Sequence, residues 1–178
     1  SMFVTPLVCW DKDAVGVQVD ILKAVTEAPG QFLTIFGQAG AGKSSLAKHL
    51  FCKADELAVY VDLKRAVALG ATSVLNMIHV FLVSAGCISW RSAETMQTLL
   101  RELSPLVILD GFDDAVRDAP GAKDALMTLL QRDVPELLGC RVVLFSREEH
   151  LKDYQGARVF LHGFSSKQQE AFAKARGV

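Results

Sequence analysis

The sequence predicts an α/β fold, in which a parallel β-sheet carries helices on both of its faces. Two features of the 178 residues indicate this. Short apolar runs alternate with segments whose apolar residues recur at helical spacing, and strands joined through helices form parallel sheets with right-handed crossovers. In addition, 51% of the residues are hydrophobic, which is enough to give one domain a substantial core.

The first third of the chain sets the pattern. Apolar residues at helical spacing predict a helix over 15–27, which Pro29 and Gly30 end. The apolar run 32–36 predicts a first strand. A helix over 43–53 and a second strand over 57–63 are predicted to follow.

The rest of the chain continues the alternation. It is predicted to form helices over 72–85, 92–103 and 122–131 and strands over 106–109, 141–145 and 158–161. The run 106–109 is wholly apolar, as expected for a central strand buried on both faces, whereas 158–161 is weaker and is expected at an edge. Ser165 or Ser166 is expected to cap a last helix.

Composition excludes several classes of function. The formal net charge is −1, so no charge excess indicates nucleic acid or an anionic membrane surface as a partner. The longest apolar stretch, 74–88, is too short to span a bilayer. The four cysteines lack the paired spacing of zinc sites and are expected to be buried apolar residues in a reducing compartment. Because no signal peptide is visible, we expect a cytoplasmic protein.

A glycine-rich loop follows the first predicted strand and opens the next helix. It comprises Gly37, Gln38, Ala39, Gly40, Ala41, Gly42, Lys43 and Ser44. Glycines at this spacing let backbone N–H groups and the helix N-terminus face the phosphates of a nucleotide. Lys43 would then reach the β- and γ-phosphates, and Ser44 would bind Mg²⁺.

Acidic residues follow the central strand. A phosphate-loop enzyme needs a carboxylate at a neighbouring strand tip to hold hydrated Mg²⁺, and Asp110 fits that role. Asp113 and Asp114 could orient or deprotonate an attacking water, or they could cap the next segment and face solvent.

An arginine follows the strand 141–145. Arg147 could sense the γ-phosphate, because a guanidinium stays charged and forms paired hydrogen bonds to phosphate. The alternative is a surface ion pair with Glu148 or Glu149. The loop, the acids and this arginine all follow strands, so we expect them to meet at one edge of the sheet.

Together these segments resemble the NACHT subfamily of the STAND class of P-loop ATPases, the nucleotide-binding module of NOD-like receptors. The resemblance rests on 32–44, 106–114, 138–147, 159–164 and the helix that follows. Its most distinctive part is the small residue Gly111 directly after Asp110, followed by the acid pair Asp113 and Asp114. Two residues depart from the pattern: Asp114 replaces a glutamate and Glu148 a frequent proline.

The resemblance implies a three-layer P-loop NTPase with a parallel five-stranded sheet of order 5-1-4-3-2. It makes Lys43, Ser44 and Ser45 ligands of phosphate and magnesium, Asp110 and Asp113 the acids, and Arg147 the sensor. It divides the chain into a leading segment, 1–30, a nucleotide-binding core, 31–164, and a C-terminal helix, 165–178, that begins a further helical domain.

The function that the resemblance implies is an ATP/ADP switch with slow Mg²⁺-dependent hydrolysis, which controls self-association and innate-immune or similar signalling by the full-length protein. A small-molecule kinase and a nucleotide-independent interaction module with a vestigial site are the alternatives. ATP is favoured over GTP because no Asn-Lys-x-Asp segment follows a late strand. The region 3–10 is a candidate for contacting adenine.

Overall fold

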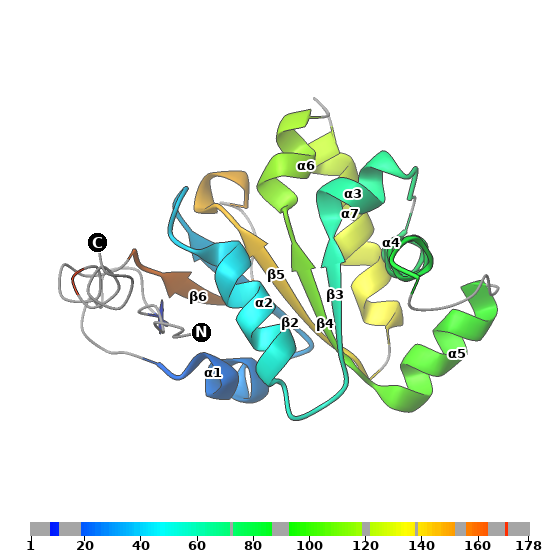
Figure 1. Cartoon of the computed structure of the whole chain (residues 1–178), viewed down its shortest axis with the longest axis horizontal. Coiled ribbons are helices and arrows are strands. Elements are labelled where there is room, and N and C mark those ends of the chain that lie inside the picture. The colour runs from blue at the N-terminus through cyan, green and yellow to red at the C-terminus, as the bar shows by residue number, and fades with distance from the viewer. Residues whose placement is uncertain are drawn as a thin grey trace.

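The middle layer of the molecule is a mixed β-sheet (Figure 1). The computed structural model describes residues 8–10, 19–71, 73–86, 93–118, 122–137, 139–151, 156–163 and 170. Within these ranges the sheet has six strands in the order β1-β6-β2-β5-β4-β3. The strands are β1 (Val8–Cys9), β2 (Phe32–Gly37), β3 (Ala58–Asp62), β4 (Leu106–Asp110), β5 (Arg141–Ser146) and β6 (Ala157–Leu161).

The sheet differs from the prediction in strand count and order because β1, at one edge, was not expected, whereas the five predicted strands keep their predicted order among themselves. β1 pairs antiparallel with β6, with Val8 opposite Leu161, so the sheet is mixed rather than purely parallel. β6 is consequently an inner strand and not the predicted edge strand. The other four pairings, β6–β2, β2–β5, β5–β4 and β4–β3, are parallel. Two apolar residues are too short a run to be recognised as a strand without the partner that pairs with them.

Helices cover both faces of the sheet, as predicted. They are α1 (Ile21–Glu27), α2 (Lys43–Lys53), α3 (Leu63–Ala68), α4 (Val74–Ser84), α5 (Ala93–Leu103), α6 (Phe112–Asp118) and α7 (Ala122–Asp133), with 3₁₀ turns at Val134–Glu136 and Glu148–His150. α1 and α2 pack on one face and α3 to α7 on the other, so each face has its own hydrophobic core. Within the described residues, no helix is long and apolar enough to cross a membrane.

The helices differ from the prediction in two respects, and a third prediction lies almost wholly outside the described residues. The helix expected from residue 15 begins at Ile21, because the Asp20 side chain accepts the Leu22 N–H at 2.9 Å and caps it there; 15–18 lie outside the described residues. The short helices α3 and α6 were not predicted, since α3 begins directly after β3 and α6 begins two residues after the end of β4. The predicted last helix lies outside the described residues except for Glu170, which is helical.

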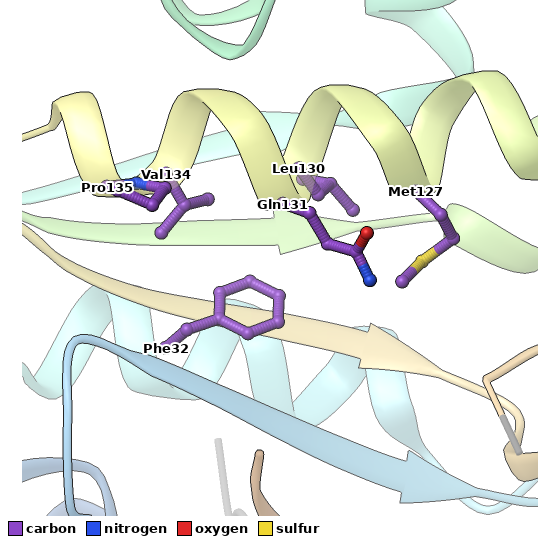
Figure 2. A pocket seen from close by; sticks show the side chains of 6 residues that line it. All are labelled: Phe32, Met127, Leu130, Gln131, Val134 and Pro135. Atoms are coloured by element: carbon purple, nitrogen blue, oxygen red, sulfur yellow. The ribbon is translucent and has the colours of Figure 1, made fainter. Parts of the chain in front are cut away.

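A small apolar pocket separates β2 from α7 (Figure 2). It measures about 180 Å³, and Phe32 faces Met127, Leu130 and Val134 across it. Phe32 is the first residue of β2, whereas the glycine-rich loop follows the last. The pocket therefore lies at the opposite end of the sheet from the candidate site.

Candidate functional site

The glycine-rich loop connects β2 to α2, and two of its glycines adopt a left-handed backbone conformation. Gly40 has φ +76° and Gly42 has φ +91°, a left-handed conformation that residues with a Cβ rarely adopt. Gly42 is the N-cap of α2, so the cap has no side chain that could accept from the first N–H groups of that helix. The first N–H groups of a helix have no partner within it and can donate to an anion.

A cavity of about 320 Å³ lies over this loop, at the carboxyl ends of the strands. The loop, the end of β4 and the end of β5 each contribute to its lining: Gln38, Ala39, Gly40, Gly42, Lys43, Ser44, Ser45, Asp110, Gly111, Asp113, Asp114, Phe145 and Arg147. Of the residues predicted from the sequence, Gly37 and Ala41 are not in this lining. The expected meeting of the loop, the acids and the arginine at one edge of the sheet is thus observed.

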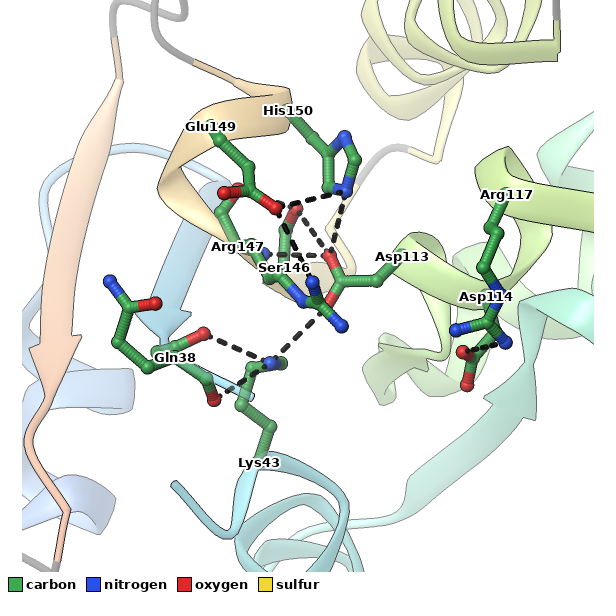
Figure 3. Close-up of polar contacts among 10 residues, drawn as sticks. Gln38, Lys43, Asp113, Asp114, Arg117, Ser146, Arg147, Glu149 and His150 are labelled. Carbon is green, nitrogen blue, oxygen red and sulfur yellow. Dashed lines mark hydrogen bonds and ion pairs between the residues drawn. The ribbon is translucent and has the colours of Figure 1, made fainter. Parts of the chain in front are cut away.

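Lys43 extends back over the loop from the first turn of α2 (Figure 3). Its ammonium donates to the carbonyl oxygens of Gly37 at 2.9 Å and Gln38 at 3.3 Å, and lies 3.1 Å from an Asp113 carboxylate oxygen. Only 13% of the Lys43 side chain is exposed. An ammonium held in this way at a helix N-terminus is placed to bind a phosphate.

Asp113 contacts the groups around it on several sides. Its carboxylate accepts the Arg147 N–H at 2.7 Å and the Ser146 hydroxyl at 3.3 Å, and the Arg147 guanidinium lies 3.4 Å away. His150 Nε2 is 3.9 Å from the same carboxylate. The Asp113 side chain is only 11% exposed, and the charges of Lys43 and Arg147 balance that of its nearly buried carboxylate. Through its contacts with Lys43 and Arg147, Asp113 therefore links the glycine-rich loop to the end of β5.

Asp114 has a different environment, although it is the next residue. Its carboxylate pairs with Arg117 at 2.7 Å, three residues along α6, and its side chain is 48% exposed. Asp114 lines the rim of the cavity, whereas Asp113 points into the cluster around Lys43 (Figure 3). The sequence alone did not show which of the two acids faces the loop. In the structure α6 directs Asp113 toward Lys43 and Asp114 toward Arg117.

The family model of the NACHT domain matches residues 31–176, nearly the whole chain. The chain belongs to the NACHT domain family. No curated protein gives a significant match. A NACHT domain is a P-loop NTPase module, which implies that this chain binds a nucleotide together with a divalent metal.

The oxygen donors of this NACHT domain fit a hydrated cation of that kind. The Asp110 carboxylate, which is 5% exposed, ends β4 and lines the same cavity as the Ser44 hydroxyl. Mg²⁺ in nucleotide sites takes few protein oxygens and keeps water and phosphate as its other ligands. Among the described residues, no group of three or more His, Cys, Asp or Glu side chains could hold a metal by itself.

Several residues at the NACHT site were not found from the sequence. Phe145 lines the cavity, Ser146 and His150 contact Asp113, and the Tyr60 hydroxyl donates to Asp110 at 2.9 Å. Ser146 could have been noticed because it directly precedes Arg147. Tyr60 carries no such signal, because only the pairing of β3 with β4 brings it to Asp110.

Proposed function

We propose that this NACHT domain binds ATP and ADP with Mg²⁺, hydrolyses ATP slowly, and acts as a nucleotide-controlled switch. The observation that carries the proposal is the cluster in which Lys43, Asp113 and Arg147 meet at the phosphate loop. Two cations that share one carboxylate can exchange it for a more highly charged phosphate group. Nucleotide binding would then rearrange contacts between the loop, α6 and β5.

Each residue has a role in this proposal. Lys43 and the loop residues Gly37–Ser45 bind phosphate, Ser44 and Asp110 hold Mg²⁺, and Arg147 contacts the γ-phosphate. Bound Mg²⁺ would supply positive charge that stabilises the leaving phosphates. Asp113 would orient the attacking water once its contact with Lys43 has opened, and Asp114, at the rim, would assist it.

Switching follows from a difference in contacts. A ligand shifts a conformational equilibrium only if it interacts differently with the two states. ATP can engage both Lys43 and Arg147 through its γ-phosphate, whereas ADP leaves Arg147 with Asp113. We propose that this difference controls self-association and signalling, innate-immune or similar, by the full-length protein.

The domain division and the location belong to the same proposal. We take 31–164 as the nucleotide-binding core, 1–30 as its leading segment and 165–178 as the start of a helical domain. Cytoplasmic location is supported by Cys9, Cys52 and Cys140, which are unbridged thiols. No observation on the described residues favours a small-molecule kinase or a nucleotide-independent module.

The first experiment is to denature the purified protein in acid and to identify the released nucleotide by ion-pair chromatography, with Lys43→Ala in parallel. We expect ADP or ATP from the parent and none from the variant. A single-turnover assay with ATP and Mg²⁺ then measures phosphate release to water. A parent protein that is empty and that does not bind ATP or ADP in solution would refute the proposal.

A further inference from the structure

We propose that Tyr60 is a positioning residue for Asp110. The Tyr60 hydroxyl holds one oxygen of the Asp110 carboxylate, so that the other oxygen faces the cation site. The inference rests on the proposed function, because it concerns how this chain presents Asp110 to the metal that accompanies the nucleotide. Tyr60 lies in β3, outside the glycine-rich loop, the acidic segment and the segment that carries Arg147.

Strand register brings the two residues together. In the parallel pair β3–β4, Tyr60 lies opposite Ile108, and Asp62 lies opposite Asp110. Paired and alternate residues share a face, so Tyr60 and Asp110 lie on the same face of the sheet, two positions apart along the strands, about 6.6 Å. The length of the phenol side chain spans that offset, and its hydroxyl lies 2.9 Å from Asp110 Oδ2.

Aromatic contacts fix the ring of Tyr60. Phe51 of α2 has its ring centroid 6.2 Å from that of Tyr60, and Phe81 of α4 lies edge-on at 6.3 Å. The same three rings contribute to the lining of an apolar groove of about 450 Å³. Because the surroundings of the ring are apolar, the hydroxyl has Asp110 as its polar partner, and the rings on α2 and α4 keep it there.

The chemistry of the donor matters for a metal ligand. A buried carboxylate needs a hydrogen-bond donor, but a lysine or arginine in that position would also cancel the charge that attracts the cation. Tyr60 donates as a neutral group. A phenol hydroxyl is a neutral donor at physiological pH, so it can bond to the carboxylate without adding a charge.

The two acids at the site are therefore held in opposite ways. Asp113 contacts the cationic groups of Lys43 and Arg147, which balance its charge. Asp110 is held by a neutral phenol, which leaves its negative charge available for the cation. This division assigns metal binding to Asp110 on electrostatic grounds that the sequence does not contain.

The test is the Mg²⁺ dependence of nucleotide binding in Tyr60→Phe, which keeps the ring and removes the hydroxyl. A fluorescent ADP analogue is titrated in EDTA and then at increasing Mg²⁺. We expect affinity in EDTA to stay within about twofold of the parent, and the Mg²⁺ concentration at half-saturation to rise about 10-fold, the lower end of the effect of losing such a partner. Thr98→Val, which removes a hydroxyl that bonds to Glu94 O on the exposed side of α5, should match the parent.

A double-mutant cycle shows whether Tyr60 acts through Asp110. If it does, Tyr60→Phe has no further effect on half-saturation by Mg²⁺ in an Asp110→Asn background. An equal effect in both backgrounds would overturn the proposal. Thermal melts check that each variant is folded, and Phe81→Leu, which loosens the ring but keeps the hydroxyl, should shift half-saturation in the same direction by less.

The outcomes separate this inference from the proposed function. A parent protein whose nucleotide affinity depends on Mg²⁺, together with a Tyr60→Phe variant of unchanged half-saturation, would refute the role of Tyr60 alone. If Tyr60→Phe does not fold, an unchanged half-saturation in Phe81→Leu refutes it. A parent protein without nucleotide binding would refute the proposed function, and the role of Tyr60 with it.

Discussion

The ammonium of Lys43 lies 3.1 Å from the carboxylate of Asp113, which itself accepts the backbone N–H of Arg147 at 2.7 Å. One acid from α6 thus holds both the phosphate-loop lysine and the segment after β5. A phosphate that binds Lys43 must compete with this carboxylate. On the proposed function, occupancy of the loop would therefore change the contacts of α6.

Lys43→Ala is expected to weaken nucleotide triphosphate binding at least about 10-fold. A hydrogen bond to a charged group contributes roughly 1.5–3 kcal/mol, and 1.4 kcal/mol corresponds to a factor of ten in affinity. Calorimetric titration with ATP and Mg²⁺ measures the effect. Lys48→Ala, an exposed lysine on the same helix, is the control and should bind like the parent. Equal affinities of Lys43→Ala and the parent would refute the phosphate-binding role of the loop.

Asp113→Asn is expected to slow ATP hydrolysis by about 100-fold while nucleotide binding is retained, because a general base contributes an effect of that size. Asp114→Asn should have a smaller effect, since its carboxylate is half-exposed and pairs with Arg117. Single-turnover hydrolysis of both variants gives the comparison. If Asp114→Asn is the slower of the two, the roles that we propose for these acids are reversed.

The phosphate loop and the sheet edge could be predicted because local sequence determines them. Glycine spacing, the apolar run 106–109 and the residues that follow each strand indicated where Lys43, Asp110 and Arg147 would meet. These features depend on backbone conformation and on strand direction, which a short stretch of sequence specifies.

What the sequence did not reveal depends on contacts between distant segments. The strand β1 forms only through its pairing with β6, and the paired residues Val8 and Leu161 are 153 positions apart in the sequence. The contact of Tyr60 with Asp110 requires the register of β3 and β4. Asp113 and Asp114 are identical in type, and only the direction of α6 decides which of them reaches Lys43.

Asp133→Ala is expected to destabilise the fold by about 1–3 kcal/mol. Asp133 ends α7, and its buried carboxylate accepts the N–H of Val74 at 2.9 Å, at the start of α4. Removing it leaves a buried backbone donor unpaired. Urea unfolding measures the loss. Asp133→Asn, which keeps an acceptor, should lose less, and equal losses in the two variants would show that the charge rather than the acceptor matters.

Cysteine reactivity should differ sharply between two sites at pH 8. Burial raises the pKa of the Cys140 thiol, which also donates to Leu100 O at 3.4 Å, so its reactive thiolate is rarer than in a free cysteine. Cys52 is exposed on α2, so the expectation that the cysteines are buried is wrong for this residue. We expect iodoacetamide to label Cys52 within minutes and Cys140 only as pH rises or after denaturation, as followed by peptide mass spectrometry. Rapid labelling of Cys140 in the folded protein would contradict its burial.

The register of the antiparallel pair β1–β6 predicts how the domain responds to tension. Val8, where β1 begins, lies opposite Leu161, where β6 ends, so the chain enters and leaves at the same end of a two-residue ladder. Tension applied through these two points opens such a ladder one hydrogen bond at a time, like a zipper, instead of shearing all bonds together. The parallel strands behind it would bear load only afterwards. With handles at residues 8 and 163, optical tweezers should record a small, low-force extension before the main unfolding event.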